Sequence, residues 1–452
     1  MRRKVFALVP WVCAPLMLQA QQPVELKDVL DRLDRLEAQN QALMTEIRAL
    51  RQQLAASPLT ASPPAATAAA AQTAEAQPVE DRVDVAEQRI AELDQTKVST
   101  EHRSPVTLTG MLLFNAFANG KGSAGTDNPV VAAPAPGQAS AGAIFRQSVI
   151  GLKVDGPTIF GGGKVSGSVY MDFFGGGTGL TQLMRLRVAR LDTTWKNTTL
   201  GFAIDKPILS PREPDSLAQV GVSPLTAAGN LWLWQPQVRL EHRIAFGDNA
   251  GLRAQAGIYE TAESGAGLAT LYPEFARARP GYQTRWEFWG QSGTRRIEIA
   301  PGFHASDTQA FGQSIPSRIF TTDWLIRPVS RVDLTGEFFS GENTGVIGGL
   351  RQGVSVVDGQ PRAVHATGGW AQLTVRMTPR AWFNFYSGQE DDRRRDLGAG
   401  SIGKNLSYGG NFMYRLGPNV LSSFEASQTR TNYVGLGTRI NPHYDLALAY
   451  LF

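Results

Sequence analysis

Cysteine and histidine are scarce in this chain of 452 residues, which contains one cysteine and five histidines. Cysteine-based zinc modules, iron–sulfur clusters and a disulfide framework are therefore excluded. A charge of one sign is also lacking, because 44 Lys and Arg face 40 Asp and Glu. The net charge of +4 is too small to indicate a nucleic-acid partner. We expect neither a cofactor nor a bound metal.

Long apolar runs are missing as well. Beyond the N-terminal segment, no apolar stretch approaches the roughly 18 residues that a membrane-spanning helix needs. Glycine is abundant, at 47 residues, and aromatic residues make up 9% of the chain, which is more than a disordered chain would carry. The sequence therefore predicts a folded protein that is either soluble or a transmembrane β-barrel.

The N-terminus has the pattern of a secretory signal peptide over residues 1–20. A basic start, Arg-Arg-Lys, precedes an apolar run that ends in a small-residue cleavage site at Ala20. This run is too short to span a bilayer, which disfavours a membrane anchor. The single cysteine, Cys13, lies within the segment, so the mature chain is expected to have none.

Two segments that follow have heptad patterns. In residues 21–54 the apolar side chains recur with a period of 3.5, which is typical of a coiled coil, and Asn40 at a core position fits a residue that fixes the register. Residues 55–78 are rich in Ala and Pro and predict a linker, and residues 79–103 carry a second, short coiled-coil pattern. A lone helix would expose its apolar seam, so the pattern implies self-association, with two or three strands left open.

From Val106 onward the apolar residues recur with a period of two. Between Lys164 and Phe173, for example, apolar and polar side chains alternate, which is typical of a strand with one apolar and one polar face. About sixteen such segments are expected in a barrel domain of residues 104–452. Their approximate ranges are 106–117, 144–154, 164–174, 184–195, 198–204, 236–246, 251–259, 281–289, 294–304, 317–327, 331–340, 365–377, 380–388, 404–415, 419–428 and 440–452.

The spacers between these segments alternate between long and short. Long ones include 118–143, 205–235, 305–316 and 429–439, whereas 196–197 is a spacer of two residues. This alternation is typical of an outer-membrane barrel, which has loops on the outer rim and tight turns on the periplasmic rim. We therefore expect an all-β fold, namely a 16-stranded antiparallel transmembrane β-barrel preceded by an N-terminal periplasmic coiled coil.

The last strand supports this interpretation. Tyr444, Leu446, Leu448 and Tyr450 share one face, and the chain ends on Phe452. A terminal aromatic residue on an amphipathic final strand resembles the assembly signal for barrel insertion into the outer membrane. The alternative is an ordinary edge strand that happens to be last.

The segments FRQSVIGLKV (145–154) and GKVSGSVYMDFFGGG (163–177), followed by Met184-Arg185-Leu186-Arg187, are similar to the second to fourth strands of the DcaP-like porins. This family is related to the phosphate-selective porins O and P. The order of export signal, heptad, linker, second heptad and barrel also resembles it over nearly the whole mature chain. The resemblance implies a homotrimer and passive uptake of small, often anionic solutes. Residues 205–235 depart from the family pattern, so the choice of solute does not follow.

If the apolar strand faces meet lipid, the polar faces line the lumen and carry a stripe of arginines. Such a stripe attracts anions. Alternatively, Glu241, Glu287 and Glu298 neutralise it in cross-strand ladders that brace the barrel, and both interpretations stay open. The predicted pore-lining arginines are Arg185, Arg187, Arg239, Arg243, Arg253, Arg285 and Arg296.

Arg190 breaks the alternation of its strand, because it shares a face with Leu186 and Val188. A bulge near Ala189 would bring Arg190 and Asp192 into the lumen. The alternative is an arginine that faces a subunit interface.

The spacer 205–235 is the longest. Loops of this length usually have their own packing or a role, so we expect it to fold into the lumen and narrow it, rather than to lie outside the barrel. The predicted constriction residues are Lys206, Arg212, Glu213 and Asp215.

These features predict a passive outer-membrane porin for small hydrophilic solutes with a weak preference for anions. The alternative is a structural protein that links the barrel to the cell wall through its coiled coil. An enzyme is disfavoured, because the histidines are scattered and no pairing of nucleophile and base is evident. The expected partners are two further copies of the chain, lipopolysaccharide and outer-membrane lipid, the barrel assembly machinery, peptidoglycan and small solutes.

Overall fold

The computed structural model describes residues 106–176, 182–261, 276–277, 280–310, 312–350 and 352–452. The predicted signal peptide, both heptad segments and the linker therefore lie outside the described residues.

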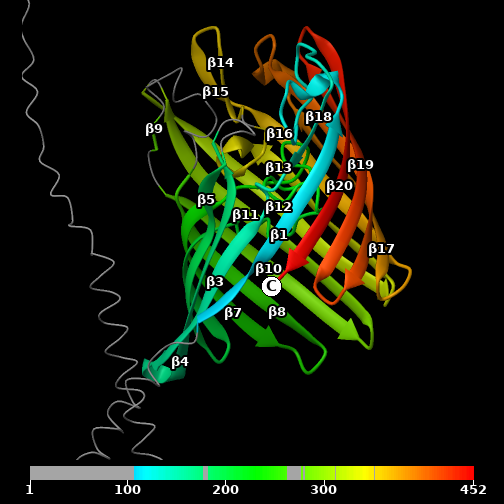
Figure 1. The fold of residues 1–452 in the computed structure, drawn as a ribbon. Coiled ribbons are helices and arrows are strands. Elements are labelled where there is room, and N and C mark those ends of the chain that lie inside the picture. The colour runs from blue at the N-terminus through cyan, green and yellow to red at the C-terminus, as the bar shows by residue number, and fades with distance from the viewer. Residues whose placement is uncertain (1–105, 177–181, 262–275, 278–279, 311, 351) are drawn as a thin grey trace, which may run out of the picture. The chain divides into compact units, whose positions relative to one another are not determined.

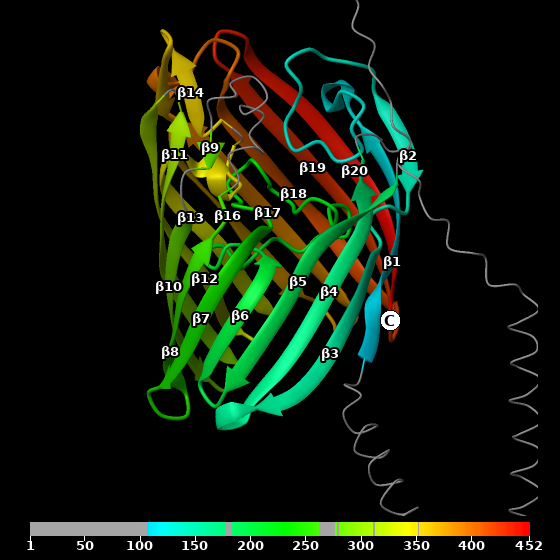
Figure 2. The ribbon, with the colours of Figure 1, turned by 90° about the vertical axis from the view of Figure 1, so that its left-hand side faces the viewer.

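Sixteen long antiparallel strands form a closed barrel (Figures 1 and 2). Closure is achieved by β20 and β1, which pair from Met111 opposite Leu451 to Asn119 opposite His443. The expected all-β barrel of sixteen strands is thus confirmed. Its strands are β1 (Val106–Asn119), β3 (Val149–Ile159), β4 (Gly163–Gly175), β5 (Leu183–Trp195), β6 (Thr198–Asp205), β7 (Gln235–Ala245), β8 (Ala250–Tyr259), β10 (Gly281–Ser292), β11 (Arg295–Ala310), β12 (Gln313–Val329), β13 (Val332–Glu342), β16 (His365–Arg376), β17 (Ala381–Asp392), β18 (Ile402–Gly417), β19 (Val420–Tyr433) and β20 (Gly437–Leu451).

Short elements decorate the rim that carries the long loops. Strand β2 (Ser140–Ile144) pairs with β1, β9 (Ala276–Arg277) pairs with β11, and β14 (Val354–Val357) and β15 (Gln360–Ala363) form a hairpin of their own. The described residues also contain the 3-10 turns η1 (Lys121–Ser123), η4 (Thr344–Ile347) and η5 (Arg394–Asp396), and η2 (Phe160–Gly162) forms the β3–β4 turn at the opposite rim. Of the helices in the described ranges, none has the length and apolar character needed to cross a membrane.

Two of the expected long spacers are wrong. Residues 305–316 and 429–439 were predicted to be loops, but β11 continues to Ala310, β12 begins at Gln313, and β19 and β20 approach within a few residues of each other. The backbone ladder extends beyond the apolar band in these hairpins. There the outward side chains become polar, so the alternation that reveals a strand ends before the strand does.

The distribution of side chains is inverted relative to a soluble protein. On β20, Tyr444 and Leu446 are 50% and 57% exposed, whereas the intervening Asp445 and its neighbour His443 are 2% exposed. The apolar face therefore points outward and the polar face inward. Closure of the barrel pairs the backbone N–H and C=O groups of every strand, which would stay without hydrogen bonds at an edge exposed to lipid.

Strand β5 contains the irregularity that Arg190 requires. Its register with β4 shifts where Tyr170 pairs with Val188 but Met171 pairs with Leu186, so that Arg187 is the extra residue. The bulge lies two residues before the predicted position. It turns Arg190 inward, where its guanidinium contacts Asp192 and Asp205. The alternative of an outward-facing arginine at a subunit interface is therefore wrong.

Candidate functional site

The segment between β6 and β7, residues 206–234, runs inside the barrel and is called the inner loop below (Figure 2). Its polar groups bind inward-facing side chains on opposite sides of the wall. The Ser210 hydroxyl donates to Glu337 on β13 at 2.6 Å, and the Ser216 hydroxyl donates to Glu425 on β19 at 2.6 Å. The expectation that this segment folds into the lumen agrees with these contacts.

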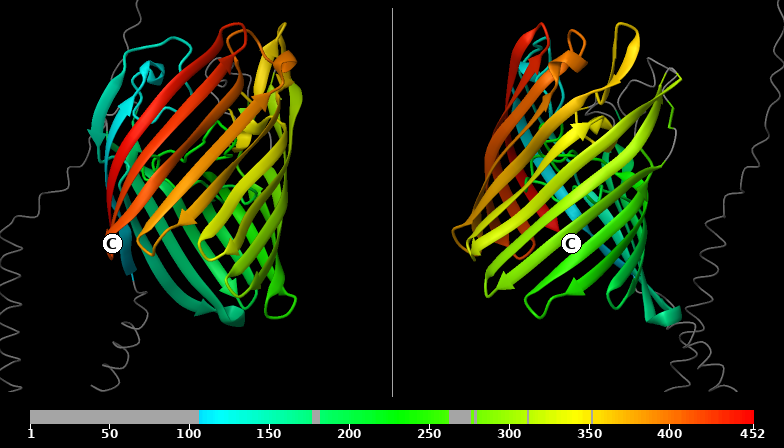
Figure 3. Two further views of the ribbon diagram at one scale, coloured as in Figure 1. Left: turned by 90° about the vertical axis from the view of Figure 1, so that its right-hand side faces the viewer. Right: turned by 180° about the vertical axis from the view of Figure 1, so that it is seen from behind.

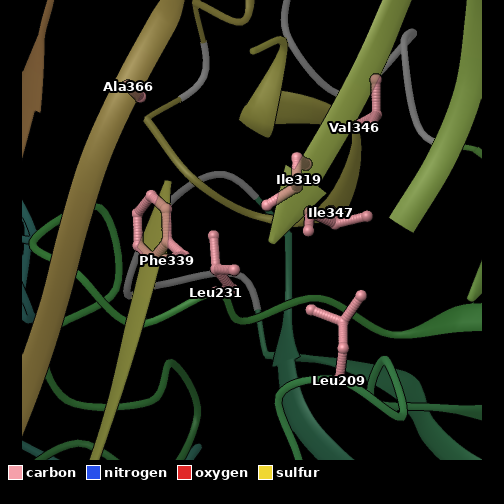
Figure 4. Close-up of a cluster of buried hydrophobic side chains, with 7 residues drawn as sticks. All are labelled: Leu209, Leu231, Ile319, Phe339, Val346, Ile347 and Ala366. Carbon is pink, nitrogen blue, oxygen red and sulfur yellow. The ribbon is translucent and has the colours of Figure 1, made fainter. Parts of the chain in front are cut away.

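An apolar cluster holds the two arms of the inner loop to one side of the wall (Figure 4). Leu209 and Leu231, which are 0% and 1% exposed, pack with Ile319 of β12, Phe339 of β13 and Ile347 of η4. Burying each such side chain is worth about 1.5–3 kcal/mol. This cluster gives the loop a hydrophobic core of its own, as a segment of this length requires.

One buried amide holds the middle of the inner loop. The Gln147 side chain, which is fully buried, donates to the Ala218 carbonyl at 2.8 Å, and its oxygen accepts from the backbone N–H groups of Val220 and Gly221, both at 2.8 Å. Sequence reasoning missed Gln147, because nothing in the alternation of its neighbours distinguishes an anchor from any other polar residue.

The first arginine group lies where β4 and β5 meet this anchored segment. Arg185 binds Asp172 through two hydrogen bonds of 3.1 and 2.7 Å, and Arg187 binds the same carboxylate at 3.0 Å. Both guanidinium groups also donate to loop carbonyls, those of Gly221 and Val220. Two arginines therefore share one fully buried carboxylate.

An indole ring joins this group. The guanidinium carbons of Arg185 and Arg187 each lie 4.9 Å from the ring centroid of Trp234, at the end of the inner loop. Cation–π attraction of this kind stabilises a cation by about 0.5–2 kcal/mol without neutralising it. The ring thus helps to hold both positive charges in place.

The second group is a network on β8, β10, β11 and β12. Fully buried Arg285 binds Asp323 through two hydrogen bonds of 2.7 and 2.8 Å and Glu287 at 2.6 Å. Arg253 contacts Glu287 at 2.5 Å, and Arg296 contacts Glu298. The network follows from register, because inward residues of adjacent strands lie opposite or diagonal to one another.

The inner loop contributes to this second network. Arg212 binds Asp323 at 2.8 Å and also binds Glu298. Four arginines thereby meet three carboxylates, with Arg212 as the member that crosses from the loop to the wall. Ion pairing to these carboxylates outweighs desolvation and raises the pKa of Arg212.

The remaining predicted arginines, Arg239 and Arg243 of β7, pair with other carboxylates. Arg239 contacts Asp205 at 3.3 Å, together with Arg190. Arg243 is 67% exposed along its side chain, close to the β7–β8 turn, and contacts only Glu241 among the described ion pairs. In the register of β7 and β8, Arg243 lies opposite Arg253 of the second network, although it shares no carboxylate with that network among the described ion pairs.

A third group was not anticipated. Arg327 of β12 and Arg376 of β16 both bind Asp333 of β13, at 2.6 Å each for their shortest contacts. As with Asp172, two arginines share one carboxylate. These residues lie near the short-turn rim, and their grouping depends on which strands are neighbours, which residue spacing alone did not reveal.

Two acidic residues of the inner loop have opposite titration behaviour. Burial raises the pKa of Glu213, but Lys206, whose ammonium lies 2.5 Å away, outweighs burial and holds the pKa below its ordinary value. Desolvation inside the barrel raises the pKa of Asp215, although Gln372 donates a hydrogen bond to it at 2.9 Å. The pKa values of these two carboxyl groups therefore depart from their ordinary values in opposite directions.

The opposite side of the lumen uses amides and hydroxyls. Asn384 donates to Asn411 at 2.8 Å, Asn411 donates to Glu425 at 3.0 Å, and the Tyr386 hydroxyl donates to Glu425 at 2.7 Å. Within the described ranges Glu425 forms no ion pair with Lys or Arg. No set of three or more His, Cys, Asp or Glu in those ranges has an arrangement able to hold a metal.

Phe452 completes the seam of the barrel. Its backbone exchanges hydrogen bonds of 2.9 and 3.1 Å with Gly110 of β1. The Phe452 ring lies against Gly110: a Cβ atom added to this glycine would be only 2.8 Å from the ring. The terminal aromatic residue is thus part of the closing strand pair.

No protein-family model and no curated protein sequence matches the chain. Solved structures do match. The outer membrane channel DcaP of Acinetobacter baumannii superposes with a TM-score of 0.63 at 14% sequence identity, over 77% of this chain and 97% of that one. An anion-selective porin from Comamonas acidovorans superposes with a TM-score of 0.53 at 11% identity, over 77% of this chain and 100% of that one. The chain therefore shares its fold with outer-membrane channels, as its resemblance to the DcaP-like porins implied.

Proposed function

We propose that this protein is a passive outer-membrane channel for small hydrophilic solutes, with a weak preference for anions. The closed barrel with an apolar exterior and a polar interior supports a channel. The fold shared with the DcaP channel and the anion-selective porin is consistent with it.

The observation that carries the anion preference is the unequal pairing of arginines and carboxylates. Asp172 and Asp333 each bind two arginines, and the network around Asp323 joins four arginines to three carboxylates. Each group keeps one positive charge in excess. The carboxylates position the guanidinium groups, so that the ladder and the anion path are two aspects of one arrangement.

The experiment is the reversal potential of the purified protein in a planar bilayer under a salt gradient. We expect conductance with a potential directed toward anion permeation. Conductance without selectivity would leave a general channel and reduce the arginines to bracing residues. Absence of conductance would favour the structural alternative, in which the inner loop closes the lumen and the N-terminal region reaches the cell wall.

We assign the constriction to the inner loop, with Lys206, Arg212, Glu213 and Asp215 as its charged residues. Lys206 and Arg212 are 24% and 17% exposed along their side chains. Replacing both with alanine is expected to lower anion selectivity, and Arg318→Ala on the outer surface of β12 is the matched control. Unchanged selectivity in the double variant would remove both residues from the filter.

The biological setting follows from the same proposal. The chain would be exported by residues 1–20, inserted by the barrel assembly machinery through its Phe452 end, and assembled as a homotrimer. Its N-terminal coiled coil would lie in the periplasm near peptidoglycan. The strand ends that bear the long loops would face the exterior, in contact with lipopolysaccharide.

A further inference from the structure

The outer surface of β17–β20 is hollowed by a groove of about 510 Å³ (Figure 3, left, where these strands face the viewer). Six of its thirteen lining residues are aromatic, among them Phe385, Tyr408, Phe424 and Tyr444. The volume lies within the range of about 300–1,000 Å³ that small-molecule sites occupy. A hollow of this size between aromatic side chains on the outer surface calls for an apolar occupant that fills it.

The groove arises from one row of residues across four strands. Gly410 pairs with Phe385 on one side and Ala426 on the other, and Ala426 pairs with Tyr444. Two small residues thus form the floor between two aromatic walls. A Cβ at Gly410 would lie 3.1 Å from the Phe385 ring, so the glycine allows that ring to lie against the strand.

A polar end closes the groove toward the rim that bears the loops. The Gln428 oxygen accepts hydrogen bonds from the Tyr408 hydroxyl at 2.6 Å and from the Arg430 Nε at 2.8 Å. The Arg430 guanidinium carbon lies 5.6 Å from the centroid of the Tyr408 ring. These contacts hold an exposed cation at the mouth of an apolar groove.

Two further cations lie at the same end. Lys404 of β18 lies opposite Asn432, which is two residues beyond Arg430 toward the loops. Its side chain is 42% exposed and lies 3.9 Å from Asp391. Arg394 of η5 donates to Asn432, two residues beyond Arg430, at 3.3 Å. Three cations near one carboxylate leave a positive surface.

We propose that this groove binds phosphorylated lipid A. One acyl chain would lie over Gly410 and Ala426, and a phosphate would bind Arg430 and its basic neighbours. The orientation rests on the proposed function, which places the loop-bearing rim in the outer leaflet. The acyl chain matches the apolar groove, and the anionic head group matches the cations that lie nearer the loop-bearing rim.

The test uses the full mature protein in detergent and native mass spectrometry with bis-phosphorylated lipid A as the probe. Arg430→Ala is expected to weaken binding about tenfold, because a charge-assisted contact to phosphate is lost. Ala426→Leu is expected to weaken it by a similar factor by filling the groove. The matched controls, Arg318→Ala and Ala371→Leu on other parts of the outer surface, are expected to bind as the parent does.

The choice of lipid separates the head group from general lipid contact. Lipid A without phosphates is expected to bind the parent and Arg430→Ala equally, and phosphatidylglycerol is expected to compete poorly. Equal binding of phosphorylated lipid A by the parent and both groove variants would overturn the proposal. So would a change of oligomeric state in Ala426→Leu without lipid, which would assign the groove to contact between copies.

Two measurements keep this test independent of folding and of the channel. Heat-modifiable mobility in gels reports whether each variant still forms the barrel, and Lys404→Ala, far from the groove floor, provides a second charge variant with an expected loss of binding. Conductance of Arg430→Ala is expected to equal that of the parent. If the protein conducts but does not bind the lipid, only the lipid site is refuted. If it binds the lipid but does not conduct, only the channel is refuted.

Discussion

Two sides of the same lumen satisfy their buried polar groups by different means. The arginine wall, on β4–β12, uses guanidinium groups around Asp172, Glu287, Glu298 and Asp323. The amide wall, on β17–β20, uses Asn384, Asn405, Asn411 and Tyr386 in hydrogen-bond chains, two of which end on the carboxyl group of Glu425. Both walls have the same backbone, so the barrel itself demands only that inward groups be paired.

The difference between the two walls shows which side chains can produce an electrostatic field across the lumen. Amides and hydroxyls satisfy one another without adding charge, whereas arginines in excess over carboxylates leave positive charge that is held in position. The inner loop joins the two walls. It gives Arg212 to the arginine wall and accepts a hydrogen bond from Asn411 at the carbonyl of Asp215. The proposed selectivity therefore belongs to one side of the lumen.

The largest expected effect concerns the buried ion pairs. Arg285→Met removes three charged hydrogen bonds to Asp323 and Glu287, which keep only Arg212 and Arg253 as partners, and is expected to cost about 3–5 kcal/mol in the free energy of unfolding. Asn384→Ala on the amide wall is expected to cost about 1–3 kcal/mol. Urea unfolding of the refolded barrel measures both.

The double variant Arg285→Met/Asp323→Asn provides the control, since removing both charges is expected to recover part of the loss. If Asn384→Ala lowered the free energy of unfolding more than Arg285→Met, the arginine wall would not be the side that depends more strongly on its buried polar contacts.

The second-largest effect concerns how firmly Gln147 and Gln372 each hold the inner loop to the barrel wall. Gln147→Ala removes three contacts to the backbone of the inner loop, whereas the only inner-loop residue that Gln372 contacts among the described hydrogen bonds is Asp215. We expect trypsin to cut after Arg212 about tenfold faster in Gln147→Ala, because cleavage follows the population of the opened loop. Equal rates in the two variants would mean that Gln147 is not the principal anchor.

A smaller effect separates charge from pairing. Arg187→Gln removes one positive charge but keeps a donor for the Val220 carbonyl, and is expected to lower the anion-to-cation permeability ratio about twofold. Arg185→Gln/Asp172→Asn removes a complete pair and leaves the net charge unchanged, so its reversal potential is expected to match that of the parent. The opposite order would show that geometry, rather than excess charge, sets the selectivity.

The smallest effect is a dependence on pH. Desolvation raises the pKa of Asp215, so its charged form is disfavoured in the folded protein, and stability is gained as the pH falls through this raised value. Glu213 has a lowered pKa, and its contribution to stability is lost as the pH falls through that lowered value. Protonation of Asp215 on acidification should remove one negative charge and increase anion preference slightly. Reversal potentials of the parent and Asp215→Asn across the acidic range check this, since the variant should lack the step that belongs to Asp215.

Much of the barrel could be predicted from residue patterns. Alternation located all sixteen strands, because lipid on one side and water or protein on the other impose a period of two. The ends of β11 and β19 could not be located in this way, since both faces of those hairpins are polar beyond the apolar band.

The site was predictable only in part. The inward position of Arg185 or Arg285 follows from alternation, but their carboxylate partners come from other strands through register, and a bulge moves Arg187 and Arg190. The joining of Arg327 and Arg376 at Asp333 depends on three strands meeting near one rim. Gln147 carries no local signal, because its importance lies in a backbone segment more than seventy residues away.

The sequence by itself determined the strands, their two faces and the length of the segment between β6 and β7, because these depend on local periodicity and on turn-forming residues. Only the tertiary structure decided which charges are paired, which side of the lumen keeps positive charge, and where the inner loop is anchored. Such properties depend on distances between groups far apart in the chain, and those distances exist only once the strands have taken their register and the barrel has closed.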